Sequence, residues 1–415
     1  MSASFLHGIE TIVKTSGAVA INTVKTAVIF LVGTAPVHET KPADTTDEEW
    51  YAQVVNQPLL ITKEEDASKY FGEVTAGYTI PSALAAIFDH GSGPVIVVNV
   101  FDPATHLTDT TPDVTKVLAD DIIGEVDAGG NRSGLQIIKN LYALYGFSGK
   151  IILCPSYCEQ ATVMAEMLSL AELHRCMALI DAQAGLSVTQ AITARGTGNL
   201  LNTSSYRAIL CYPRAKIDNA LEPLSQRLAG VMAATDNALG YWYSPSNQTI
   251  QGITGMERPL SFGMSDENSD LNLLNAAGFL SIYNNYGSGY KVWGNRSAAF
   301  PTQTDPKVFI PVIRTSDVIA ESIEYYVMKY LDKPINIAID GVISDVNAFL
   351  RTLVGRGALI DGKCYFDKAQ NSATEMAAGH LVFTYEMMPP TPAERITFNQ
   401  VINIDLLNSL LTTNI

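Results

Sequence analysis

The stretch TAVIFLVGTAP, residues 26–36, decides the fold of this chain. Its centre is continuously apolar and rich in β-branched side chains, and Gly33 and Pro36 mark its end. Such an uninterrupted run is typical of a strand that is buried on both faces, because a strand with one wet face would alternate. The sequence therefore predicts a central strand of a parallel sheet here.

Similar runs follow as PVIVVNVF (94–101), KIILCP (150–155), CMALID (176–181) and YRAILCYP (206–213). Helical patterns separate them, at residues 80–91, 133–146, 159–174 and 222–240. Strand alternating with helix indicates βαβ units, so we predict a doubly wound α/β sheet over roughly residues 26–240. Residues 102–131 are rich in Asp, Thr, Pro and Gly, and we expect a surface insertion with a small β element there.

The pattern changes after residue 240. Residues 241–270 are rich in loop-forming side chains and are too long for an idle connection within a compact domain. The helical and strand patterns that follow no longer alternate simply. We therefore predict an α/β domain over residues 26–280 and an α+β domain over residues 281–388.

The composition points to contacts between protein subunits. Only 17% of the 415 residues are charged, against about a quarter in an ordinary soluble domain. A membrane does not explain this, because the longest apolar run, Ala27 to Val32, is far short of the roughly 20 residues of a spanning helix. No secretory signal pattern is visible. The net charge of −15 disfavours nucleic acid as a direct partner.

The sequence shows no recognisable active site. His90, in DHGSG, is better explained as the end of a helix than as a catalytic base, and Ser265 lies in a loop without the glycines of a nucleophile elbow. Cys154 and Cys158 lack a second ligand pair, so we expect free thiols, no metal and no cofactor. Two alternatives stay open at this point: a hydrolase-like α/β enzyme with an unrecognised site, and a ligand-binding α/β protein.

Both ends of the chain carry short extended patterns. In PPTPAERITFNQVINID, residues 389–405, three prolines precede apolar residues at alternate positions, with Gln400 interrupting the apolar face. This pattern predicts a half-buried strand on a stiff tether. The stretch GIETIVK (8–14) is too short to form a stable sheet by itself. Each end therefore needs a partner sheet.

Three C-terminal motifs resemble those of the contractile tail sheath proteins of phages and phage-derived injection particles. They stand here as KVWGNRS (291–297), the strand-to-helix junction FIPVIRTSDVIAESI (309–323) and MPPTPAERITF (388–398). The N-terminal half agrees, with INTVKTAVIFLVGTAPV and LAGVMAATDNALGYWYSPSN, so the resemblance runs nearly end to end. Ser297 stands where threonine is usual, and Ile313 where a second arginine is common.

The resemblance implies a non-enzymatic structural subunit without a cofactor. It implies an outer domain of subtilisin-like topology (26–280), an inner domain facing the tail tube (281–388), and exchanged terminal arms (1–25 and 389–415). Subunits would form stacked hexameric rings that contract without nucleotide and drive the tube through the target envelope. The implied partners are other copies, the tail tube, baseplate and tail terminator proteins, with no membrane insertion. The implied location is the virion, after assembly in the host bacterial cytoplasm.

The resemblance also assigns candidate residues. The strand arms would use Ile9, Ile12, Val13, Ile396, Phe398, Ile402 and Ile404, and the N-terminal linker would be Ala20, Ile21, Asn22 and Thr23. The motif positions expected in the inner domain are Trp293, Gly294, Asn295, Arg296, Arg314 and Asp317. Two helix-like segments, AQNSATEMAAG (369–379) and DLLNSLL (405–411), are candidates for contact with the tube.

Overall fold

The computed structural model describes residues 23–91 and 93–409, and its centre is an eight-stranded sheet with the order β13-β12-β8-β7-β6-β1-β3-β2. Neighbouring strands from β12 to β3 run parallel, and β13 and β2 are added antiparallel at the two edges. The strands are β1 (Ile29–Gly33), β2 (Leu59–Ile61), β3 (Val95–Asn99), β6 (Ile151–Leu153), β7 (Met177–Asp181), β8 (Ala208–Cys211), β12 (Phe279–Asn285) and β13 (Gly289–Trp293). The predicted mixed α/β fold with a large, mostly parallel sheet is confirmed, and the first five parallel strands follow the flavodoxin-type order of doubly wound sheets.

Helices cover both faces of this sheet, which explains why β1 is apolar at every position. Ile29 and Leu31 belong to one apolar core, and Phe30 and Val32 belong to the other. The first core includes residues of α1 (Asp47–Val54), α2 (Glu64–Phe71), α3 (Ile80–Phe88) and α8 (Leu224–Ala238). The second includes residues of α4 (Ala119–Ile123), α5 (Leu141–Tyr145), α6 (Ala161–His174), α7 (Val188–Ala194) and α9 (Asp270–Ala276).

One segment beside the sheet differs in detail from the sequence prediction. Residues 133–146 form a 3₁₀ segment, η2 (Gly134–Asn140), before the short α5, rather than one helix. Residues 134–138 are all buried, and a helix with one solvent-exposed face could not bury five consecutive residues.

Residues 102–131 do contain a small β element, the hairpin of β4 (Leu107–Thr108) and β5 (Thr111–Pro112). A second small sheet joins β9 (Ala215–Ile217), β10 (Ala220–Glu222) and β11 (Gly255–Met256).

The large sheet continues past residue 280, where we expected the first domain to end. Strand β12 pairs with β8, and β13 pairs with β12, so residues 281–293 belong to the sheet. Residues 309–323 were expected to be a strand-to-helix junction. Only Phe309 is extended, and residues 310–323 belong to the long helix α10 (Ile310–Val327), which follows the 3₁₀ turn η4 (Pro306–Val308). Pro311 lies in the first turn of α10, where its missing N–H costs nothing.

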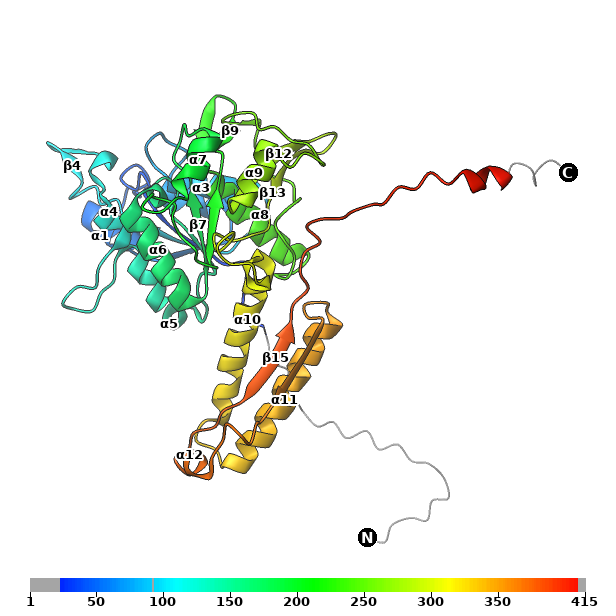
Figure 1. Cartoon of the computed structure of the whole chain (residues 1–415). Coiled ribbons are helices and arrows are strands. Elements are labelled where there is room, and N and C mark those ends of the chain that lie inside the picture. Colours follow the sequence, from blue (N-terminus) through cyan, green and yellow to red (C-terminus); the bar gives the residue numbers. More distant parts are fainter. Residues whose placement is uncertain (1–22, 92, 410–415) are drawn as a thin grey trace, which may run out of the picture.

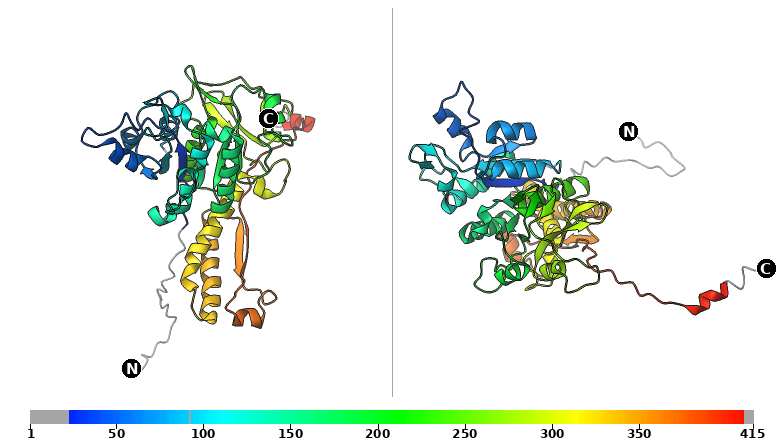
Figure 2. Two further views of the ribbon diagram at one scale, coloured as in Figure 1. Left: turned by 90° about the vertical axis from the view of Figure 1, so that its left-hand side faces the viewer. Right: turned by 90° about the horizontal axis from the view of Figure 1, so that it is seen from above.

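Helix α10 leads out of the sheet body into a helix hairpin (Figures 1 and 2). After η5 (Met328–Tyr330) the chain returns through α11 (Ile335–Gly355), which packs against the two-stranded sheet of β14 (Asp361–Tyr365) and β15 (Thr384–Met388). Helix α12 (Ala373–Ala377) lies at the far tip of the hairpin (Figure 1). A separate apolar cluster, which includes Ile319, Val346 and Phe349, holds this unit together. The C-terminal arm then runs outward from the body to η6 (Ile404–Asn408).

Candidate assembly junction

The three C-terminal motifs meet where β13, the start of α10 and the base of the C-terminal arm come together. KVWGNRS leaves β13 and runs past the start of α10. There the Asn295 carbonyl accepts a hydrogen bond from the Ile310 N–H at 2.9 Å, and the Ser297 N–H donates to the Val308 carbonyl at 2.8 Å. The motif therefore joins the edge of the large sheet to the helix that leaves it.

Trp293 and Gly294 set the path of this connection. The Trp293 ring packs against Tyr283 and Phe262, with ring centroids 5.0 and 5.4 Å apart. Gly294 has a φ of +127°, and a Cβ there would lie 2.7 Å from Asn275 Oδ1. A larger residue would be strained by its backbone and would also collide, so the close approach requires glycine.

Arg296 holds the base of the C-terminal arm. Its guanidinium lies over the rings of Phe300 and Phe309, 4.0 and 5.1 Å from their centroids. Its Nε donates to Glu394 Oε1 at 2.9 Å, and its Nη2 donates to Oε2 of the same carboxylate. Planar, two-point contacts of this kind between Arg and a carboxylate are strong and directional. The WGNR and PAER motifs are therefore two halves of one clamp.

Beyond this clamp the arm exposes its apolar side chains. Ile396, Phe398 and Ile402 are 71%, 89% and 86% exposed. Residues 391–403 form no strand among the described residues, so the predicted strand exchange stays a prediction. Ile404, predicted to be the last residue of the strand, is the first residue of η6, so its backbone turns instead of continuing the alternation.

The N-terminal arm enters near the same helix. Ile9, Ile12, Val13, Ala20, Ile21 and Asn22 lie outside the described residues. Thr23 is half-buried, and the next residue, Val24, donates its N–H to Ser322 Oγ on α10 at 3.2 Å. Helix α10 is thus adjacent to the points from which both arms depart.

A stripe of charged side chains docks α10 on the sheet body. Arg314, Asp317, Glu321 and Glu324 recur at helical spacing on one face of α10. The three acidic members meet basic residues that immediately precede β6, β7 and β8, at the amino edge of the sheet. These pairs are Arg207–Asp317 (3.1 and 2.6 Å), Lys150–Glu321 (2.5 Å) and Arg175–Glu324 (2.6 and 2.7 Å).

These contacts range from buried to exposed. Arg314 donates to Asp236 of α8 at 2.8 Å, and the two side chains are 6% and 1% exposed. Burial raises the pKa of Asp317, while its pairing with Arg207 acts in the opposite direction. Burial raises the pKa of Tyr142, and its hydrogen bond to Glu321 acts in the same direction. Removing one partner of such a buried pair leaves an uncompensated charge, so this interface resists partial opening.

The sequence candidates for catalysis have structural roles. His90 Nδ1 lies 2.9 Å from the Ala86 carbonyl, and its Nε2 accepts the Gln251 N–H at 3.0 Å, so backbone groups occupy both ring nitrogens. The Cys154 and Cys158 thiols are buried, and burial raises the pKa of both. Among residues 23–91 and 93–409, no cluster of His, Cys, Asp or Glu could hold a metal ion. No helix in the same part of the chain is long and apolar enough to cross a membrane.

The sequence analysis singled out Arg314 and Asp317 but missed their partners. A signal was present: Lys150, Arg175 and Arg207 each stand one or two residues before an apolar strand run. Glu321 and Glu324 extend the helical spacing of Arg314 and Asp317. Basic residues at one sheet edge and an acidic helix stripe predict an interface only when considered together, because neither is unusual alone.

The fold and this junction define a class of protein, namely an α/β body joined by one long helix to a helix hairpin, with an exposed apolar arm clamped at its base. Residues 130–298 match the family described as phage tail sheath protein central domain, and residues 302–403 match the phage tail sheath C-terminal domain. The tail sheath protein of Burkholderia phage BcepMu is 39% identical, with 99% of both chains covered. The tail sheath protein of Escherichia phage P2 is 26% identical, also over 99% of both chains.

Solved structures show the same fold. The contracted helical sheath of the anti-feeding prophage superimposes with a TM-score of 0.68 at 20% identity, covering 97% of this chain and 100% of that one. The contracted PVC sheath gives a TM-score of 0.66 at 16% identity, covering 98% and 100%. The chain belongs to the phage tail sheath protein family. It is a subunit of a contractile tail sheath and a virion component, and because this family is structural, the enzyme alternative falls away.

The docking stripe predicts that buried and exposed pairs respond differently to loss of the arginine. Arg207→Met should lower the free energy of unfolding by about 3 kcal/mol, because Asp317 stays buried without its partner. Arg175→Met is the matched control and should cost no more than about 1 kcal/mol, because its partner Glu324 is exposed. Urea unfolding of the purified chain measures both. Equal losses would contradict the assignment of a buried, charge-paired interface.

The clamp predicts local release of the arm. Arg296→Ala should increase proteolysis within residues 389–399 several-fold without lowering the midpoint of thermal unfolding, because Glu394 loses its two-point contact at the surface. Arg395→Ala is the control, since Arg395 lies 3.8 Å from Glu267 with both side chains about four-fifths exposed. If the two variants are cleaved at the same rate, Arg296 does not hold the arm.

Proposed function

We propose that the chain polymerises as stacked hexameric rings around a tail tube, and that the ring lattice contracts without nucleotide hydrolysis to drive the tube through a target envelope. The observation that carries this proposal is the C-terminal arm, clamped at Glu394 and apolar but exposed beyond it. Membership in the sheath family and the likeness to two contracted sheaths support it. The low share of charged residues agrees, since lattice contacts would cover much of the surface.

The arms join neighbouring subunits by adding strands to the sheet of β14 and β15. Within the described residues neither strand pairs with any other, so both outer edges offer backbone N–H and C=O groups. Burial of each large apolar arm residue contributes about 1.5–3 kcal/mol, and ordering each arm residue costs about 1–2 kcal/mol. A single arm therefore binds its neighbour weakly, and the many arm contacts of a lattice together bind the subunits strongly. Because arm and acceptor are different surfaces, the contact is head-to-tail and extends into a helix instead of closing a dimer.

In this proposal the chain has two domains, which occupy different positions in the sheath. The sheet body is the outer domain, and the helix hairpin with β14 and β15 is the inner domain that faces the tube. The break between the two family matches, at residues 298–302, supports a boundary between β13 and α10, later than residue 280. The strand order gives no separate support to the subtilisin-like topology implied by the resemblance, which stays a prediction.

The remaining partners are proposed from the same family. A similar chain occurs in the anti-feeding prophage baseplate, with a TM-score of 0.66 and 19% identity, which supports contact with baseplate proteins. The tail tube and tail terminator proteins complete the set, with no direct nucleic acid and no membrane insertion. Either α12 at the tip of the hairpin or η6 at the end of the arm contacts the tube.

Substitutions in the arm test the proposal. Phe398→Asp should leave the isolated chain as stable as before, within about 0.5 kcal/mol, because this side chain is already exposed. It should abolish tube formation in electron micrographs, because a charge would enter the partner sheet. Asn399→Asp, on the opposite face of the arm, is the control and should still form sheaths. Ending the chain at Met388 should give the same folded, unassembled product as Phe398→Asp. Normal sheaths from the truncated chain would contradict the arm exchange.

A further inference from the structure

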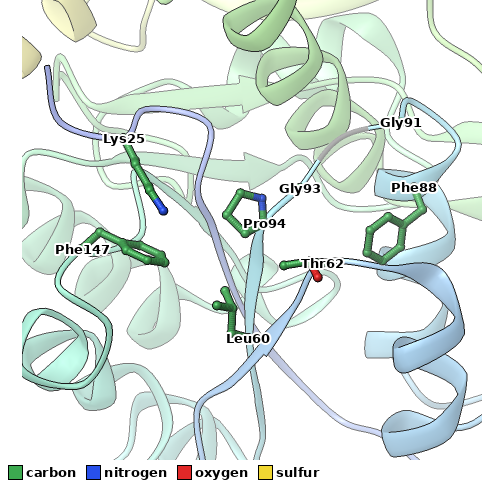
Figure 3. Close-up of a pocket in the computed structure, with 8 residues that line it drawn as sticks. All are labelled: Lys25, Leu60, Thr62, Phe88, Gly91, Gly93, Pro94 and Phe147. Atoms are coloured by element: carbon green, nitrogen blue, oxygen red, sulfur yellow. The ribbon is translucent and has the colours of Figure 1, made fainter.

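The amino edge of the large sheet is only partly covered. Helix α10 docks where β6, β7 and β8 begin, whereas a hollow of about 570 Å³ lies where β1 and β3 begin (Figure 3). Leu60 of β2, Phe88 of α3, Pro94 and Phe147 give the hollow an apolar lining, and Lys25 lies at its rim. Leu60 is 37% exposed, so a partner could bury further apolar surface here.

Lys25 departs from the pattern of the other basic residues at this edge. Lys150, Arg175 and Arg207 each form an ion pair with a carboxylate of α10. Lys25 is exposed, its Nζ lies 4.1 Å from the centroid of the Phe147 ring, and it forms no ion pair with a carboxylate in residues 23–91 or 93–409. The complement of this surface is a carboxylate followed by bulky aliphatic side chains.

We infer that this hollow receives residues 405–407 of a second copy of the chain, with Asp405 facing Lys25 and the two leucines in the apolar lining. This inference rests on the proposed arm exchange and adds a second contact to it. Leu406 and Leu407 are 69% and 63% exposed in η6, and Asp405 is the second residue of the same 3₁₀ turn. The segment therefore presents the required charge and apolar surface together.

The geometry favours another copy over the chain's own arm. The arm leaves the body away from the side that carries β1 and β2 (Figures 1 and 2). Residues 389–405 span at most about 60 Å when fully extended, so the arm can carry η6 far from its own body. The docked turn would fix the end of an arm whose middle adds to the neighbour's sheet.

Disulfide trapping tests this contact in assembled sheaths. We expect L60C/L406C sheaths to give ladders of covalent multimers on mild oxidation, about a hundredfold faster than L273C/L406C sheaths, because docked thiols react at a high effective concentration. Leu273 is the matched control, since it is 40% exposed and lies on α9, away from the hollow. The five native cysteines are buried and should not compete.

Several outcomes would overturn the inference while leaving the sheath function intact. These are equal rates for the two pairs, cross-linking within one chain, and trapping by L60C/I12C in place of L60C/L406C, which would assign the hollow to the N-terminal segment. A charge exchange gives an independent result: K25E and D405K should each lower the yield of sheath about fivefold, and K25E/D405K should restore it. No rescue would also count against the pair. Failure of the unsubstituted chain to form any sheath would instead overturn the proposed function.

Discussion

The docking of α10 across the amino edge of the sheet is the contact on which the rest of the structure depends. The helix begins beside the segment that follows β13 and pairs with basic residues at the starts of β6, β7 and β8. It then continues into the hairpin (Figure 1). Its ion pairs with Lys150, Arg175, Arg207 and Asp236 replace the water that would otherwise solvate the strand ends. Buried charges are costly unless paired, so the buried pairs of Glu321, Asp317 and Arg314 hold this interface closed, whereas the exposed Arg175–Glu324 pair contributes little.

In the proposed sheath, this interface would let each subunit transmit force between its arms. Among its charged residues, Arg314, Asp317 and Glu321 are buried in ion pairs that hold α10 against the body. The arms depart beside α10, one through Val24 and Ser322 and the other through Arg296 and Glu394. A pull on either arm therefore acts on the one helix that joins both parts of the subunit. In the proposed lattice, neighbouring subunits would rearrange through their arms while each subunit moves as a rigid body.

The sequence predicted the fold best where one local pattern decides the structure. Continuous apolar runs predicted β1, β3, β6, β7 and β8, because strands buried on both faces leave that signal directly. The sequence analysis placed most of β12 and all of β13 beyond the end of the first domain, whereas both strands belong to the large sheet. Their sequences, FLSIYNN and GYKVW, contain polar residues, so only their pairing shows that they belong to this sheet. The sequence analysis named Arg296, Arg314 and Asp317 as motif positions, and the structure places all three in ion pairs. Their partners lie far away in the sequence, so only the folded chain could assign their contacts.

The most direct measurement is a pair of cryo-EM reconstructions of the sheath assembled by this chain, one extended and one contracted. If α10 joins body and hairpin rigidly, the Arg207–Asp317 and Arg314–Asp236 contacts will be present in both, and one subunit will superimpose on the other throughout residues 26–388. The arms will change direction relative to that unit. Loss of these ion pairs in either state, with a different angle between α10 and the large sheet, would contradict the account.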